Sequence, residues 1–145
     1  SSISPDIRGG LWAKLFVNVG INGLTAIYNR TNGQILTSCA ARGKLKTLVK
    51  EAEEVARARG IAIEGDPVAA TLTVCKRTAR NISSMLQDIR NHRPTEIDAI
   101  NGAVSRLART ENIATPLNDE IIARVKEIER KALSSGTDND EDKQS

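Results

Sequence analysis

Aromatic, cysteine and histidine residues are scarce in this sequence of 145 residues. Only 2% of the residues are aromatic, so few side chains could stack on the bases of a single-stranded nucleic acid. Cys39 and Cys75 are far apart in the sequence, and their spacing fits neither a metal site nor a redox motif. We expect two small buried thiols in a reducing compartment. Because His92 is the only histidine, a metal site built from several histidines is excluded.

Long apolar runs are also missing. No run approaches the roughly 20 residues of a membrane-spanning helix, and no segment resembles a signal peptide. We therefore expect a soluble, cytoplasmic protein without a membrane partner. The length fits one domain, and the start at Ser1 without a methionine suggests a processed or excised piece.

Acidic residues are concentrated at the end of the chain. The net charge is +3, but residues 136–145 hold four acidic residues against one lysine, which leaves +6 on the rest. A basic body suits a phosphorylated cofactor or an acidic substrate. Nucleic acid ranks well behind both, given the lack of aromatic residues.

A helical period dominates the first segment, 6–29, where apolar residues recur at intervals of three and four. Four polar residues follow the same period and form one line along the helix: Lys14, Asn18, Asn22 and Thr25. Asparagine is a poor residue for a helix interior, so this line is either a ligand-binding face or a set of contacts between helices. Gly20 and Gly23 predict close approach of a neighbouring segment.

The remaining apolar patterns are helical too, and no run alternates as a strand does. We expect helices over 41–59, 66–80, 85–91, 96–110 and 117–133, with 31–38 as a connector. The prediction is an all-α multi-helix bundle over residues 1–135, followed by a flexible acidic tail over 136–145.

The stretch 81–101 organises the chain. Ser84 and Thr95 are each followed three residues later by a capping-box partner, and Pro94 separates the two predicted helix starts. This arrangement places Asn81, Ser84 and Glu96 at loop and helix-start positions, which favour anions. The alternative roles are structural: Ser84 could cap its helix and Glu96 could complement a helix dipole.

Two segments resemble a known family. The stretch SSMLQDIRNHRPTEIDAINGAV with the downstream TPLN, and the earlier LWAKLFVNVGINGLTA, closely resemble the C-terminal domain of ketopantoate reductase (2-dehydropantoate 2-reductase). The resemblance covers about residues 6–133. It implies the helical bundle of the 6-phosphogluconate dehydrogenase C-terminal-domain-like fold.

The resemblance also implies NADPH-dependent reduction of 2-dehydropantoate to pantoate, a step toward pantothenate and coenzyme A. By position, the family's catalytic lysine and active-site glutamate are Lys14 and Glu96. Its substrate-binding residues are Asn18, Asn22, Asn81 and Ser84. Lys14 would stabilise the charge on the keto oxygen and donate the proton, while Glu96 would either orient Lys14 or contact a ligand.

No strand followed by G-x-G-x-x-G is found, so the N-terminal Rossmann domain, which would bind most of the NADPH, is absent from this chain. We expect the isolated chain to be inactive. Its implied partners are a small 2-keto acid, its own Rossmann domain and a second copy in a homodimer. The alternative function is a non-enzymatic helical dimerisation or partner-binding module derived from the fold.

The chain departs from the family at two places. Asn91-His92 replaces a small residue and glycine before the arginine of the RPTEID motif, and Asn112 replaces a glycine before the final Thr-Pro. Histidine adopts positive φ less readily than asparagine, so the loop before Glu96 is expected to differ in shape. This departure leaves the exact 2-keto acid open.

Overall fold

The computed structural model describes the backbone of residues 5–144 and the side chains of residues 10–134. Within these limits the chain forms seven helices and no strand. The helices are α1 (Pro5–Tyr28), α2 (Asn32–Thr37), α3 (Cys39–Ala58), α4 (Pro67–Arg77), α5 (Ser84–Arg90), α6 (Asn101–Thr110) and α7 (Pro116–Gln144). The prediction of an all-α bundle is confirmed.

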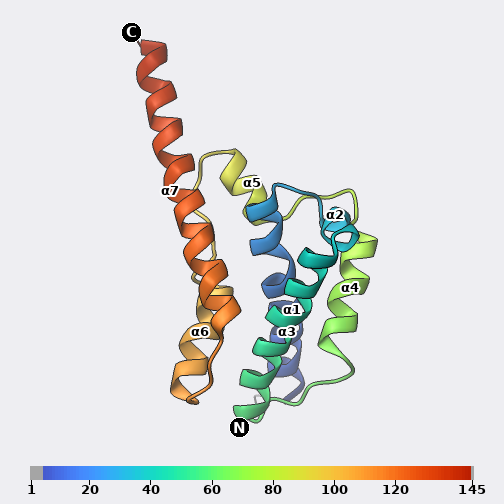
Figure 1. Cartoon of the computed structure of the whole chain (residues 1–145). Coiled ribbons are helices and arrows are strands. Elements are labelled where there is room, and N and C mark those ends of the chain that lie inside the picture. Colours follow the sequence, from blue (N-terminus) through green and yellow to red (C-terminus); the bar gives the residue numbers. More distant parts are fainter. Residues whose placement is uncertain (1–4, 145) are drawn as a thin grey trace.

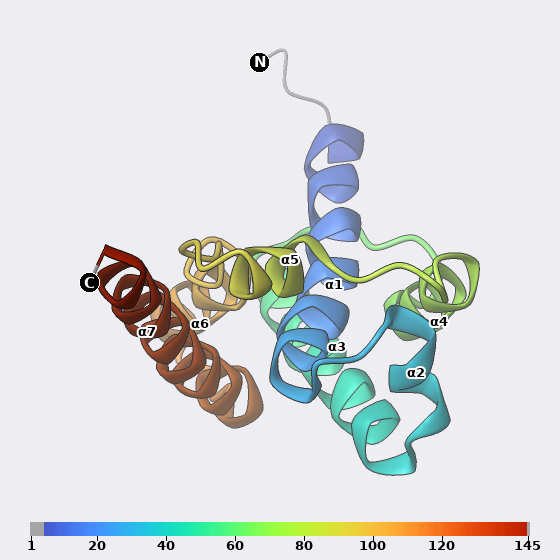
Figure 2. The same cartoon turned by 90° about the horizontal axis from the view of Figure 1, so that it is seen from above.

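Helix α1 runs through the middle of the bundle. It lies beside α3, with α6 and α7 on one side and α2 and α4 on the other (Figures 1 and 2). The short helix α5 lies beside the C-terminal end of α1 (Figure 1). Every residue from Val19 to Ala26 is buried, because this part of α1 is surrounded by its neighbours.

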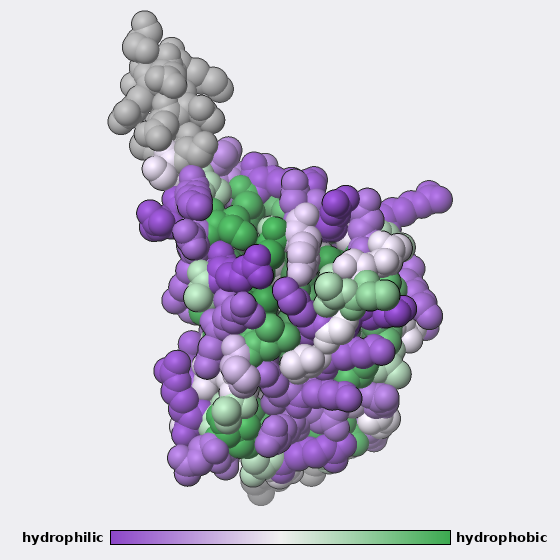
Figure 3. Space-filling view, in the orientation of Figure 1, coloured by the Kyte–Doolittle hydropathy of each residue, from purple (hydrophilic) through white to green (hydrophobic). Residues whose placement is uncertain are grey.

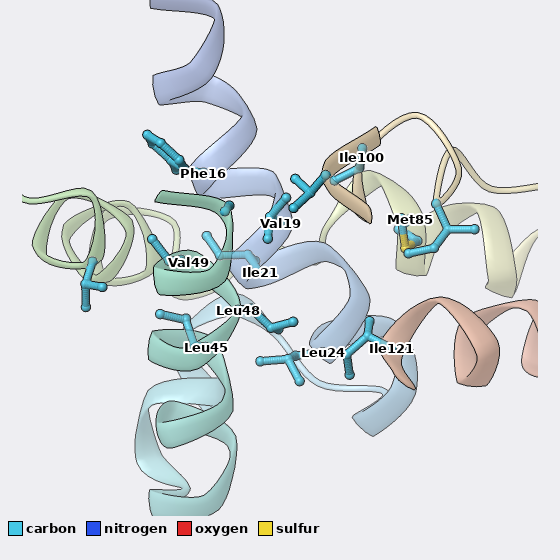
Figure 4. Packing of buried hydrophobic residues seen from close by; sticks show 14 of the residues in the cluster. Phe16, Val19, Ile21, Leu24, Leu45, Leu48, Val49, Met85, Ile100 and Ile121 are labelled. Carbon is cyan, nitrogen blue, oxygen red and sulfur yellow. The ribbon is translucent and has the colours of Figure 1, made fainter. Parts of the chain in front are cut away.

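The core forms where α1, α3 and α7 meet. Leu24 of α1 lies between Leu48 of α3 and Ile121 of α7, and all three side chains are fully buried (Figure 4). Burying a side chain of this size contributes about 1.5–3 kcal/mol. Val19 of α1 lies next to Ile100, which brings the segment before α6 onto the same helix (Figure 4).

Both glycines in the middle of α1 lie at close contacts, as the sequence predicts. A Cβ atom at Gly20 would lie 2.9 Å from Cγ2 of Val49, and one at Gly23 would lie 2.5 Å from Cγ2 of Ile121. Real Cβ atoms do not approach so closely, so α3 and α7 can pack at these distances only against glycine.

Three predicted boundaries differ from the structure. Residues 31–38, expected to be a connector, contain α2, because Thr31 and Gln34 form a capping box: the Gln34 N–H donates to Thr31 Oγ1 and the Thr31 N–H donates to Gln34 Oε1. Helix α6 begins at Asn101 and not at Glu96. Helix α7 extends to Gln144 and so includes the segment 136–145 up to that residue, which was predicted to be a flexible tail. The side chains from residue 135 on lie outside the described part of the chain, and the flexibility of the tail stays a prediction.

Among the described residues, three non-glycine residues have positive φ, and two of them lie where the resemblance places a glycine. His92 has φ 57° and Asn112 has φ 58°. At His92 this conformation ends α5, since the His92 N–H donates to Ile89 O at 3.2 Å and the Arg93 N–H donates to Asp88 O at 2.8 Å. Both residues therefore adopt a backbone conformation that glycine favours, and the expected difference in loop shape from the family stays a prediction.

The visible face in Figure 3 is mostly hydrophilic, with apolar atoms in small patches between the helices. Leu11 of α1 is an apolar residue that is 66% exposed. Cys75 is buried as expected, whereas Cys39 at the start of α3 is exposed. No described helix is long and apolar enough to span a bilayer.

Candidate active site

The polar line on α1 passes from the surface into the bundle. Lys14 is exposed, Asn18 is half-buried, and Asn22 is only 7% exposed. Thr25, at the end of the line, is fully buried. The helical spacing of the sequence therefore produces a row of polar groups whose outer end faces solvent and whose inner end faces the core.

The side-chain amide of Asn22 lies near the buried end of the polar line. The backbone carbonyl of Asn22 accepts a hydrogen bond from Thr25 Oγ1 at 2.9 Å, but its side chain makes no hydrogen bond with any described residue. The side chains of Lys14 and Asn18 also lack a hydrogen-bond or ionic partner among the described residues.

The start of α5 meets the inner end of this line. Ser83, and not Ser84 as predicted, caps α5: its Oγ accepts a hydrogen bond from the Leu86 N–H at 3.1 Å. The same oxygen lies 2.6 Å from Oγ1 of Thr25 on α1. Ser84 is exposed, and its hydroxyl makes no contact that would compete with ligand binding.

Asn81 lies in the loop before α5, and its side chain is exposed. Its backbone carbonyl accepts a hydrogen bond from the Asn32 N–H at 2.9 Å, and its N–H donates to Thr78 O at 2.9 Å. The backbone of this loop is thus fixed against the start of α2. The side chain stays unpaired among the described residues.

Glu96 lies in the loop between α5 and α6, with an exposed side chain. The predicted capping box at Thr95 does not form. The Thr95 hydroxyl donates to Glu129 of α7, and Asp98 pairs with Lys126. The Glu96 backbone carbonyl accepts the N–H groups of Ala99 and Ile100, which forms a turn before α6.

This turn rests on α1. Ile97 and Ile100 are 1% and 7% exposed, and the side-chain amide of Asn101 donates to Val19 O at 3.3 Å. Val19 directly follows Asn18, so the segment carrying Glu96 is attached to the middle of the polar line. The side chains of Lys14 and Glu96 nevertheless form no ion pair with each other in the described part of the chain.

Besides α1, three segments carry predicted site residues: the loop with Asn81, the start of α5 and the turn with Glu96. Two of them contact α1 along the polar line, since the start of α5 contacts Thr25 and the turn after Glu96 contacts Val19. Asn81 is held three residues before Ser84, against α2 instead of α1. Sequence reasoning missed Ser83, Asn101 and Glu129 as supporting residues. Only Ser83 carries a local signal, because it too has the cap-forming side chain at the start of a helix.

A separate cavity of about 320 Å³ lies near the end of α1 and contains none of the predicted site residues. Its lining comes from α1, α2 and the start of α3: Tyr28, Arg30, Gln34, Ile35, Thr37, Ser38 and Ala41. Among the described residues, no group of three or more His, Cys, Asp or Glu side chains could hold a metal ion.

Similarity to known proteins points in one direction. The family model described as "Ketopantoate reductase PanE/ApbA C terminal" matches residues 6–129. The 2-dehydropantoate 2-reductase of Escherichia coli O157:H7 is 43% identical over 138 residues, covering 91% of this chain and 43% of the relative. The chain therefore spans less than half the length of this relative.

Solved structures agree. The PanE/ApbA family ketopantoate reductase from Ralstonia eutropha JMP134 matches with a TM-score of 0.83 and 32% identity, over 87% of this chain and 42% of that one. A dimeric ketopantoate reductase from Staphylococcus aureus matches with a TM-score of 0.78 and 30% identity, over 87% and 44%. D-mandelate dehydrogenase with NADH and anilino(oxo)acetate matches with a TM-score of 0.78 and 32% identity, over 89% and 43%. With the helical bundle, the polar line of α1 and a family match over most of its length, the chain belongs to the ketopantoate reductase C-terminal domain family.

Proposed function

We propose that this chain is the substrate-binding and catalytic domain of a cytoplasmic, NADPH-dependent reductase that converts 2-dehydropantoate to pantoate. The observation that carries the proposal is the line of polar groups on α1, which runs from the exposed Lys14 through the half-buried Asn18 to Asn22, whose side-chain amide makes no hydrogen bond with a described residue. An amide that no neighbouring residue uses is free to donate to and accept from a ligand. The similarity to 2-dehydropantoate 2-reductases supplies the chemical identity of that ligand.

We expect this chain to contact only the reactive end of the nicotinamide cofactor. The described residues contain no strand and so no Rossmann unit, and a separate N-terminal domain is proposed to bind most of NADPH. Lys14, Ser84 and Glu96 are exposed and unpaired among the described residues, as a site completed by a second domain requires. The cofactor supplies a hydride to the keto carbon of the substrate.

Each side chain then has a role that follows from its chemistry. The ammonium of Lys14 donates a hydrogen bond to the keto oxygen, stabilises the charge that develops there and delivers the proton. Asn18 and Asn22 can donate to and accept from substrate oxygens. The Ser84 hydroxyl, left free because Ser83 caps α5, donates to the substrate carboxylate, with Asn81 nearby.

Glu96 is assigned to the ligand and not to Lys14. The two side chains form no ion pair in the free domain, so the carboxylate is available to accept a hydrogen bond from a substrate hydroxyl. In this arrangement Lys14 acts at the carbonyl and Glu96 anchors another part of the same molecule.

The full-length protein containing this domain tests the proposal, with 2-dehydropantoate and NADPH as substrates. Lys14→Ala should lower kcat by about 10²–10⁴-fold, the usual contribution of a positioned proton donor. Lys46→Ala, which removes an exposed lysine of α3, is the matched control and should leave kcat unchanged. Equal turnover of wild type and Lys14→Ala would defeat the proposal.

A second candidate is the NADH-dependent reduction of another 2-keto acid. It is favoured by the similarity to D-mandelate dehydrogenase and by His92, which replaces glycine in the loop before Glu96. The values of kcat/KM for 2-dehydropantoate and for aryl or branched 2-keto acids, each with NADPH and NADH, separate the candidates. A preference for 2-dehydropantoate with NADPH supports the first.

We further propose a homodimer, as in the dimeric Staphylococcus aureus relative. Sedimentation of the full-length protein tests this assembly. A purely structural dimerisation module would give no reason for a line of three polar side chains, Lys14, Asn18 and Asn22, that make no hydrogen bond or ion pair with a described residue, so the enzymatic function is preferred.

A further inference from the structure

One face of α7 holds the loop that carries Glu96. Ring nitrogen Nδ1 of His92 lies 2.7 Å from the backbone carbonyl of Ala132, and Glu129 binds Thr95. Both α7 positions lie on the same side of the helix because they are three residues apart. The loop runs alongside α7 on its way from α5 to α6 (Figure 1).

Of these two contacts between α7 and the loop, the one between Glu129 and Thr95 is the stronger. The Thr95 N–H donates to Glu129 Oε2 at 2.9 Å, and the Thr95 hydroxyl donates to the same oxygen at 2.6 Å. Both side chains are half-buried. Hydrogen bonds to an ionised carboxylate are shorter and about twice as strong as neutral ones.

Glu96 lies between two fixed neighbours. Thr95 before it is bound by Glu129, and Ile97 after it is 1% exposed and donates its N–H to Thr95 Oγ1 at 3.4 Å. The backbone of Glu96 is therefore held on both sides, while its carboxylate remains unpaired among the described residues. Such an arrangement fixes the position from which the Glu96 side chain extends before any ligand arrives.

We propose that Glu129 is a positioning residue, which acts through Thr95 to hold Glu96 in the geometry that binds substrate. The proposal rests on the function assigned to Glu96 above. A third α7 contact to the loop joins Lys126 Nζ and Asp98 Oδ1 at 2.9 Å, and both of these side chains are more than half exposed. An exposed ion pair of this kind adds little, so it does not share the role of Glu129.

The test compares Glu129→Ala, Glu129→Gln and Lys126→Ala in the full-length protein. Glu129→Ala should lower kcat/KM by up to about 100-fold, since small misplacements of reacting groups cost this much. Glu129→Gln should recover most of the activity, because an amide oxygen can accept both hydrogen bonds from Thr95. Lys126→Ala should stay within about twofold of wild type.

A double-mutant cycle with Glu96→Ala separates positioning from general destabilisation. If Glu129 acts through Glu96, the loss caused by Glu129→Ala should largely disappear in the Glu96→Ala background. Additive losses in the double variant would overturn the positioning role. The role would also be overturned if Glu96→Ala were impaired while Glu129→Ala remained as active as wild type. An unimpaired Glu96→Ala enzyme would instead contradict the function proposed for Glu96.

Hydrogen exchange gives a readout that does not depend on turnover. The Thr95 amide should exchange faster in Glu129→Ala than in wild type or Lys126→Ala, and Glu129→Gln should restore its protection. Equal protection in wild type and Glu129→Ala would show that Glu129 does not hold the loop, and would reject the proposal even if the parent protein reduced no 2-keto acid.

Discussion

The hydroxyl groups of Thr25 and Ser83 lie 2.6 Å apart in the core, although 58 residues separate them in the sequence. The Thr25 hydroxyl donates its hydrogen to the backbone carbonyl of Asn22, so the Ser83 hydroxyl must be the donor of the pair. Ser83 in turn accepts the Leu86 N–H. A continuous chain of hydrogen bonds therefore connects the cap of α5 to the backbone of Asn22 on α1.

Removing the Thr25 hydroxyl should destabilise the protein. In Thr25→Val the buried hydroxyl of Ser83 loses its acceptor, and an unpaired buried group of this kind costs about 1–3 kcal/mol. Urea denaturation measures the free energy of unfolding. Thr73→Val is the matched control, since Thr73 is exposed and its hydroxyl donates to the backbone carbonyl of Ala69 in its own helix. If Thr73→Val lowered the free energy of unfolding as much as Thr25→Val, the hydrogen bond from Ser83 to Thr25 would not be the source of the loss.

Of the two adjacent serines, only Ser83 should contribute appreciably to the free energy of unfolding. Ser83→Ala removes the cap of α5 and should lower the free energy of unfolding by about 1 kcal/mol. Ser84→Ala removes an exposed hydroxyl and should change stability by less than about 0.5 kcal/mol.

The kinetic effect of Ser84→Ala follows from its proposed bond to the substrate carboxylate. A hydrogen bond to a charged group is worth about 1.5–3 kcal/mol, so the KM for the 2-keto acid should rise roughly 10- to 100-fold. Steady-state kinetics of the full-length protein measures this change. If Ser84→Ala were destabilised and kept its KM, Ser84 would be a structural residue and not a ligand.

Much of the fold is predictable from the sequence, because helical periods and proline starts are local signals. The interval of three to four residues identifies α1, and Pro67 and Pro116 lie at the starts of α4 and α7. Helix α2 was missed because Asn32-Gly33 is a typical turn signal. There the glycine is required by packing instead, since a Cβ at Gly33 would lie 2.5 Å from Cβ of Ala79.

The candidate site was less accessible to sequence reasoning. Spacing alone placed Lys14, Asn18 and Asn22 on one line, but their steady increase in burial depends on which helices surround α1. The choice of Ser83 over Ser84 as the cap depends on a tertiary contact with Thr25. The role of Glu129 could not be predicted either, because its partner Thr95 is 34 residues away in the sequence.

Gly23 should not tolerate a side chain. In Gly23→Ala the new methyl group would lie 2.5 Å from Cγ2 of Ile121, so α1 and α7 must move apart, at a cost of about 1–3 kcal/mol. Gly43→Ala is the control: nothing lies within 4 Å of its Cβ position, and alanine stabilises a helix by up to about 1 kcal/mol over glycine. Urea denaturation should therefore give opposite signs for the two variants, and Gly23→Ala with unchanged stability would show that the helices are not in tight contact.

Cys75 should make the stability fall at alkaline pH. Burial raises the pKa of the Cys75 thiol from 9.0 to about 11, because the thiolate would lose its hydration. The unfolded chain releases this proton near pH 9 while the folded chain retains it, so the unfolded state binds fewer protons above pH 9. The contribution of Cys75 to stability is thus complete below pH 9 and is lost as the pH rises toward about 11. Across this pH range, the free energy of unfolding should fall less steeply in Cys75→Ala than in wild type. Cys39→Ala, which lacks only an exposed thiol, is the control and should follow the wild-type slope. Identical slopes in wild type and Cys75→Ala would contradict the effect of burial on the Cys75 thiol.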